Sequence, residues 1–245
     1  SVRSTGLAAD GPLRFKLTFG EVPSEVAVSF DSYKEGLSRA WLQDEVVSVM
    51  YVPQTVTLSR RLAFRYVKIE LLGSSPYYDF NIHDMKCMAQ TSAKNIPEEL
   101  PQAVDPMIRK IDRVGLNTLK ECMQTVYEDG PKRDQRLWIG DLYLEALGNN
   151  YSYKQHDLTK RCLYLLAGLS DLNGYLLATV IENPVPRAQD KQFLYEYALL
   201  YNVTLKDYLE ATGDMETVKD LWPVAKKQLD IVRTNVKANG LMDFE

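Results

Sequence analysis

The hydrophobic pattern of this chain changes its period near residue 92, and no other feature constrains the fold as strongly. From Leu13 to Met88, short runs rich in Val, Phe, Tyr and Thr are separated by turn clusters, which predicts β-strands. After Pro106, apolar residues recur mostly at spacings of three and four, which predicts helices in series. The sequence therefore predicts a β module followed by a helical module.

The β module is predicted to span residues 1–92 as a β-sandwich of the jelly-roll type. Turn clusters such as FGEVP at 19–23 and GSSPYY at 73–78 separate its strands. The predicted strands are LRFKLTF at 13–19, EVAVSF at 25–30, VVSVMYV at 46–52, TVTLSRRLAF at 55–64 and YVKIELL at 66–72.

The segment at residues 93–106 is predicted to be a linker, because TSAKNIPEELPQAVDP carries three prolines and little periodicity. Antiparallel helices joined by short loops then fit either a bundle or the first arc of a toroid of helical hairpins, and periodicity alone does not choose between them. Five helices are predicted, at residues 107–126, 131–148, 157–169, 192–212 and 215–237, with Thr212–Asp214 and Asn239–Gly240 as terminators.

Composition excludes several classes of function. Lys and Arg number 29 against 33 Asp and Glu, which gives a net charge of −4 and argues against a nucleic-acid partner. No apolar run approaches the roughly 20 residues of a membrane-spanning helix. No glycine-rich dinucleotide or phosphate loop is present, so no cofactor is predicted.

The thiols and imidazoles offer little chemistry. Cys87, Cys122 and Cys162 are odd in number and far apart, so we expect buried thiols rather than disulfides or a metal pair. Only His83 and His156 are available for a zinc site or a Ser-His-Asp triad. No metal site is predicted, and any catalysis must rely on carboxylates.

The densest functional signal is the acidic stretch EDGPKRDQRLWIGD. Asp129 is predicted to cap a helix that has Pro131 near its first position. Asp134 and Asp141 are seven residues apart, so two helical turns would place both carboxylates on one face with Trp138 between them.

An aromatic ring between two acids is typical of a sugar site. Sugars offer apolar faces to rings and hydroxyls to carboxylates, and neighbouring like charges raise the pKa of a general acid. In the alternative interpretation, Trp138 packs in the core and the charged side chains form solvated ion pairs worth at most about 1 kcal/mol each. The charged residues concerned are Lys132, Arg133, Asp134 and Arg136.

Three strings resemble the opening of the catalytic domain of bacterial α-L-rhamnosidases, glycoside hydrolase family 78. They are EDGPKRDQRLWIGDLYLEAL, NNYSYKQHDLTKRCLYLLAGL and LKDYLEATGDMETVKDLWP. LSRAWLQDEV and RRLAFRYVKIEL resemble the last β-sandwich domain before the catalytic barrel of that family. The resemblance implies that residues 107–245 are the first part of an (α/α)6 six-hairpin glycosidase domain, a fold whose twelve helices exceed the five predicted here.

The resemblance also implies an inverting hydrolase that removes terminal α-L-rhamnosyl residues from a glycan or glycoside. The family motif is an Asp, an acid five residues later, and then Trp-x-Gly-Asp. It assigns Asp134 as the general acid, where many members carry Glu, and Asp129 and Asp141 as ligands of rhamnose hydroxyls. Arg133 would tune Asp134 or hold a substrate oxygen, and Trp138 would bind substrate.

The general base is expected in a later part of the enzyme, beyond this chain, and Glu245 is an improbable base because chain termini are poorly ordered. Glu196 lies near a further acidic position of the family, whereas Tyr195, Tyr197 and Tyr201 are predicted to pack in the core. By analogy the enzyme is expected in the periplasm or outside the cell, with the cytoplasm as the alternative.

Two alternatives to this function stay open at the level of sequence. One is a non-catalytic carbohydrate-binding or accessory module, made of the β-sandwich and a helical remnant. The other is a helical-toroid hydrolase that acts on another sugar, since a fold does not dictate its substrate.

Overall fold

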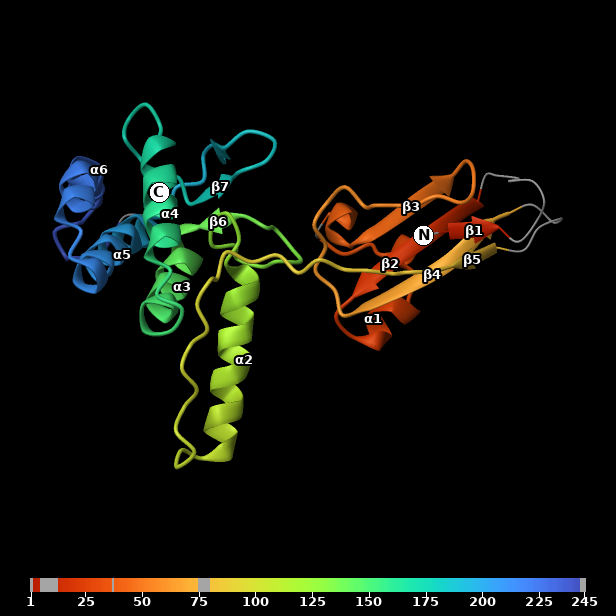
Figure 1. The fold of residues 1–245 in the computed structure, drawn as a ribbon. Helices are drawn as coiled ribbons and strands as arrows, with labels where there is room; N and C mark the ends of the chain where they lie inside the picture. The colour runs from red at the N-terminus through yellow and green to blue at the C-terminus, as the bar shows by residue number, and fades with distance from the viewer. Residues whose placement is uncertain (1, 5–12, 37, 75–79, 243–245) are drawn as a thin grey trace. The chain divides into compact units, whose positions relative to one another are not determined.

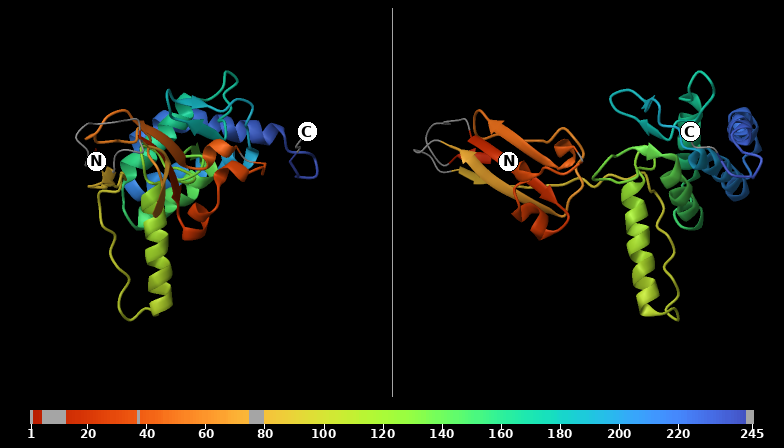
Figure 2. Two further views of the ribbon diagram at one scale, coloured as in Figure 1. Left: turned by 90° about the vertical axis from the view of Figure 1, so that its right-hand side faces the viewer. Right: turned by 180° about the vertical axis from the view of Figure 1, so that it is seen from behind.

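The computed structural model describes residues 2–4, 13–36, 38–74 and 80–242. Figure 1 shows the ribbon of these residues, and Figure 2 shows it from two further sides. Within these ranges, no helix combines the length and the apolar character that crossing a membrane requires.

The chain forms two compact units, and each has its own hydrophobic core. The first, called the β unit here, comprises residues 1–89 and 131–133. The second, called the helical unit, comprises residues 90–130 and 134–245.

The main sheet of the β unit has three antiparallel strands in the order β3-β2-β4, and β1 pairs with β5 in a second sheet. Side chains alternate along β2, so Leu13 and Phe15 enter the core with Val49. The ring of Phe80 meets Phe15 edge to face at 5.4 Å, which joins both sheets to one core. The elements are β1 (Val2–Ser4), β2 (Leu13–Gly20), α1 (Pro23–Ala27), β3 (Asp44–Val49), β4 (Tyr66–Gly73) and β5 (Phe80–Ile82).

Three of the predicted strands are confirmed, at β2, β3 and β4, and two are wrong. EVAVSF forms the end of α1 and a 3₁₀ turn at Phe30–Ser32, because Pro23 starts a helix and the Glu25 carboxylate accepts the N–H of Glu21. Residues 55–64 form no strand, and the Ala63 N–H donates to the Gln43 side chain. The jelly-roll arrangement stays a prediction, and the predicted turn at 73–78 lies mostly outside the described residues.

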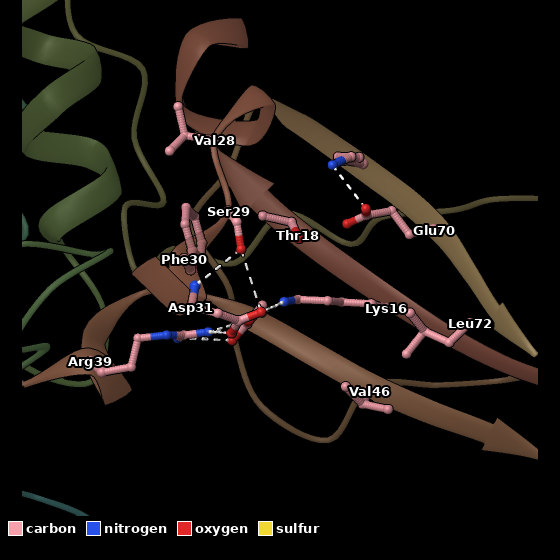
Figure 3. A pocket seen from close by; sticks show the side chains of 12 residues that line it. Lys16, Thr18, Val28, Ser29, Phe30, Asp31, Arg39, Val46, Glu70 and Leu72 are labelled. Carbon is pink, nitrogen blue, oxygen red and sulfur yellow. Dashed lines mark hydrogen bonds and ion pairs between the residues drawn. The ribbon is translucent and has the colours of Figure 1, made fainter. Parts of the chain in front are cut away.

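The sheet face opposite the core carries an ion-pair network around Lys16 (Figure 3). The Lys16 ammonium lies 2.8 Å from Asp31 and 3.6 Å from Asp44. The Arg39 guanidinium binds both carboxylates, and it binds Asp44 through both of its terminal nitrogens. The network lines a hollow of about 590 Å³, and its charges are mutually paired. It therefore joins the loop at Asp31 and Arg39 to the sheet.

Replacing Asp44 by Asn is expected to destabilise the β unit by about 1–3 kcal/mol, because Lys16 and Arg39 would then lose a charged partner in a shielded place. The Asp44 side chain is 16% exposed. Asp31→Asn is a matched control, because Asp31 shares both cations but is 69% exposed, so its loss should destabilise the unit clearly less than the loss of Asp44. Urea unfolding of the chain measures both, and equal effects would contradict the burial argument.

In the helical unit, three of the helices begin or end where the sequence supplies a cap. The Asp105 carboxylate accepts the N–H groups of the first turn of α2, and Asp214 accepts the Thr217 N–H at the start of α6. Gly213 ends α5 with a φ of 71°. The helices are α2 (Pro106–Cys122), α3 (Ile139–Tyr151), α4 (His156–Gly168), α5 (Tyr195–Thr212) and α6 (Met215–Thr234).

The predictions for α2, α4, α5 and α6 are confirmed as helices, with shifted ends. Residues 93–105 form neither helix nor strand and run along α2 (Figures 1 and 2). The predicted helix at 131–148 is wrong over its first eight residues, because α3 begins at Ile139. Strand β6 (Leu137–Trp138) directly precedes α3 in the sequence. It pairs with β7 (Thr179–Ile181), which also pairs with β8 (Arg187–Ala188), and the three strands form a small antiparallel sheet. Its strands have two or three residues, too few for a periodic pattern in the sequence.

Candidate active site

The acidic stretch forms a closed loop rather than a helical turn. The Asp129 N–H donates to the Arg136 carbonyl at 3.0 Å, and the Arg136 N–H donates to the Asp129 carboxylate at 3.2 Å. Asp134 and Gln135 have φ values of 64° and 52°, in the left-handed region that an α-helix cannot contain. Asp129 therefore caps this loop, and the prediction that Asp134 and Asp141 share one helix face is wrong.

The loop nevertheless brings the predicted acids together. The carboxyl groups of Asp129 and Asp134 lie close enough for the charge of Asp134 to act on Asp129. Asp141 lies in the first turn of α3, and its charge acts on Asp129 while that of Asp134 acts on Asp141. Three carboxyl groups thus converge between the loop and the start of α3, by a route that helical periodicity does not describe.

This convergence changes the acidity of the carboxyl groups. Burial is the largest cause that raises the pKa of Asp129, and the charges of Asp134 and Asp141 add to it, so the pKa is about 7 despite the bond from Arg136. Burial, followed by the charge of Asp134, also raises the pKa of Asp141. The cluster therefore retains a proton near neutral pH, as a site for general acid catalysis requires.

Two residues that the sequence analysis did not single out for the site extend the cluster. Glu145 lies one turn after Asp141 on α3, near the buried thiol of Cys122, and the two groups influence each other's pKa. The Glu145 Oε2 atom is buried and has no hydrogen-bond partner among the described residues. Burial, followed by the charges of Asp141 and Asp129, raises the pKa of Glu145 to about 9. The spacing of four residues between Asp141 and Glu145 places them on one face of a helix, and this signal in the sequence could have identified Glu145.

Cys122 and Cys162 are buried, as expected, but Cys87 is exposed, so the expectation for Cys87 is wrong. Burial, followed by the charge of Glu145, raises the pKa of Cys122 to about 12, which keeps its thiol protonated.

Arg133 belongs to the β unit and lies with its guanidinium over the ring of Trp41, 5.4 Å from the centroid. In the same unit, Gln43 donates to the Lys132 carbonyl at 3.0 Å, and the Lys132 ammonium pairs with Glu25. These contacts hold the segment 131–133. The role of Arg133 toward a substrate stays a prediction.

The aromatic residues divide between core and site. Tyr201 is buried and donates to the Leu163 carbonyl, which confirms its place in the core. Tyr195 packs against Phe193, and Glu196 is exposed in the first turn of α5.

Trp138 ends β6 and is partly exposed, and the ring of Tyr197 meets it edge to face at 6.4 Å. Tyr197 packs against the hydrophobic core, and the charges of Asp141 and Asp129 contribute to raising the pKa of its hydroxyl. Its place in the core was predicted from the sequence, whereas its place beside the carboxylates follows only from the packing of α5 against α3.

Comparison with known protein families now identifies the chain. Residues 102–244 match the bacterial α-L-rhamnosidase six-hairpin glycosidase domain. Residues 1–89 match the N-terminal domain of glycosyl hydrolase family 78 α-rhamnosidases. The chain belongs to glycoside hydrolase family 78. The helical unit is accordingly part of a six-hairpin glycosidase domain, which agrees with a helical toroid rather than a simple bundle.

Solved structures of family 78 enzymes have the same fold. A rhamnosidase from Klebsiella oxytoca with rhamnose bound is 40% identical, with a TM-score of 0.93 over 99% of this chain and 47% of that chain. This chain thus spans about half the length of the Klebsiella oxytoca enzyme. A family 78 rhamnosidase from Bacillus sp. GL1 and an α-L-rhamnosidase from Streptomyces avermitilis are 18% and 16% identical, with TM-scores of 0.64 and 0.62, over 24% and 22% of those chains. Comparison with curated protein sequences returned no match.

Proposed function

We propose that the enzyme containing this chain hydrolyses terminal α-L-rhamnosyl residues of glycans or glycosides, with inversion at the anomeric carbon. The observation that carries the proposal is the convergence of the Asp129, Asp134 and Asp141 carboxyl groups, whose charges act on one another. The bound rhamnose of the 40% identical Klebsiella oxytoca enzyme supports the choice of sugar.

In this proposal Asp134 donates a proton to the glycosidic oxygen as the bond to the anomeric carbon breaks. The charge of Asp134 acts on Asp129, so the two carboxyl groups lie close together at the proposed position of the glycosidic bond. Asp129 and Asp141 then accept hydrogen bonds from the sugar hydroxyls, and Trp138 offers a ring to the apolar face of the sugar. Arg133 is proposed to steady a substrate oxygen.

An inverting reaction needs a second carboxylate, roughly 6.5–9.5 Å from the acid, to activate water. We assign that base to a part of the enzyme beyond this chain. Asp129 and Asp141 are unsuited to the role, because the charge of Asp134 acts on both of them and both have a raised pKa.

The test is hydrolysis of an aryl α-L-rhamnoside by the protein as its source makes it, followed by proton NMR from the first turnover. The expected result is release of the β-anomer of L-rhamnose before mutarotation. Faster release from an aryl glucoside would replace the sugar in the proposal. Saturable rhamnose binding with no release of product would replace the enzyme by a carbohydrate-binding module.

A further inference from the structure

The first turn of α3 is shaped around one side chain of α5. A Cβ atom added to Gly140 would lie 2.5 Å from Cζ and 2.7 Å from the hydroxyl oxygen of Tyr197. Optimal contacts between carbon atoms lie at about 3.5–4.0 Å, so no larger residue fits at this position while the phenol stays in place. Gly140 therefore lets the Tyr197 hydroxyl approach the backbone immediately before Asp141.

This position puts the phenol among the residues of the candidate site. Its ring meets Trp138 edge to face, and its side chain is partly exposed. Burial, followed by the charges of Asp141, Glu196 and Asp129, raises the pKa of Tyr197. The hydroxyl consequently stays protonated and can donate a hydrogen bond over the whole physiological pH range.

The chemistry of a sugar makes such a donor useful. Ionised carboxylates accept hydrogen bonds only, whereas each sugar hydroxyl both donates and accepts. An ionised Asp141 can accept the proton of a sugar hydroxyl, but it cannot donate to the oxygen of that hydroxyl. Among the described residues, the Tyr197 hydroxyl has no hydrogen-bond partner, which leaves it available to a ligand.

We propose that Tyr197 is a substrate-binding residue, which donates its hydroxyl to a sugar oxygen whose own proton is accepted by Asp141. The inference rests on the proposed function and extends it, because the sugar is then held from α5 as well as from α3. It also gives Gly140 a role, namely to leave room for the phenol.

Tyr197→Phe is expected to weaken the binding of L-rhamnose about tenfold, the size expected for one lost hydrogen bond. Isothermal titration of the full-length protein with L-rhamnose measures this effect, and urea unfolding checks that the variant folds. Tyr151→Phe is the matched control, because Tyr151 is an exposed tyrosine at the far end of α3 and its variant should bind as the wild type does. Gly140→Ala should weaken binding as well, because its methyl group would displace the phenol.

Equal L-rhamnose affinity of the wild type and Tyr197→Phe would overturn the proposal. A loss of L-rhamnose affinity in Tyr197→Ala but not in Tyr197→Phe would also overturn it, because the ring would then only fill space. A wild-type protein that binds L-rhamnose but hydrolyses no rhamnoside would refute the proposed function alone, and the comparison with Tyr197→Phe would still decide the role of this residue.

Discussion

Asp134→Asn is expected to lower the turnover of alkyl α-L-rhamnosides by the full-length enzyme about 10³-fold, because an amide cannot give a proton to the glycosidic oxygen. General acid catalysis contributes about 10²–10⁴-fold. The kcat/KM for a 2,4-dinitrophenyl rhamnoside should fall far less, because its leaving group departs without protonation. The ratio of the two losses, measured as kcat/KM, separates a proton donor from a residue that only binds the sugar.

Two further variants frame this result. Asp134→Glu should retain part of the activity, since a carboxyl group remains at a position where many family members carry Glu. Glu216→Gln removes an exposed carboxylate from the first turn of α6 and should leave the turnover of both substrates unchanged. If Asp134→Asn lowered kcat/KM for both substrates equally, Asp134 would be a binding residue and another residue would have to be the acid.

Glu145→Gln is expected to stabilise the folded chain by about 2–4 kcal/mol at pH 8, the largest stability change foreseen here. The folded pKa of about 9 lies above the ordinary value of 4.5 because the carboxyl is buried near other acids. The folded state then holds a proton that the unfolded state releases, so Glu145 lowers the free energy of unfolding as pH rises from about 4.5 to 9. The glutamine side chain of the variant is neutral at every pH, so the variant does not lose this free energy of unfolding. Burying the N–H groups of the amide offsets part of the gain.

The measurement is urea unfolding at several pH values between 5 and 9. The groups that face Glu145 are Cys122 on α2, Glu128 and Asp129 on the loop, and Asp141 on α3. Asp129, whose pKa is about 7, titrates in the same window, so the difference between variant and wild type is the informative quantity. That difference should grow with pH. A difference that does not change with pH would contradict a protonated Glu145, and Glu216→Gln again serves as the control.

Sequence periodicity predicted the long elements well. Apolar and polar residues alternate along β2 from Leu13 to Phe19, and α4, α5 and α6 each run for three turns or more, so their patterns repeat often enough to be recognised. The short elements were missed for the converse reason. Strand β6 is defined by a partner far along the chain, with Leu137 opposite Val180, and β7 and β8 have only three and two residues.

The candidate site was predicted by motif and corrected in its geometry. Resemblance to the rhamnosidase motif chose Asp129, Asp134, Trp138 and Asp141, while helical spacing gave a wrong account of why they meet. Asp134 has a left-handed backbone, which local propensity disfavours for any residue except glycine and, less strongly, Asn and Asp. Such a conformation persists only where the loop closure between Asp129 and Arg136 enforces it.

By itself the sequence determined the change from strands to helices and the family, and it proposed the acids of the candidate site, because these depend on residue type and on spacing along the chain. Tertiary structure alone decided which groups accompany those acids. Glu145, Cys122 and Tyr197 reach the cluster through the packing of α2 and α5 against α3. Their pKa values and contacts arise from burial and from distances between segments far apart in the chain, and no local pattern encodes either quantity.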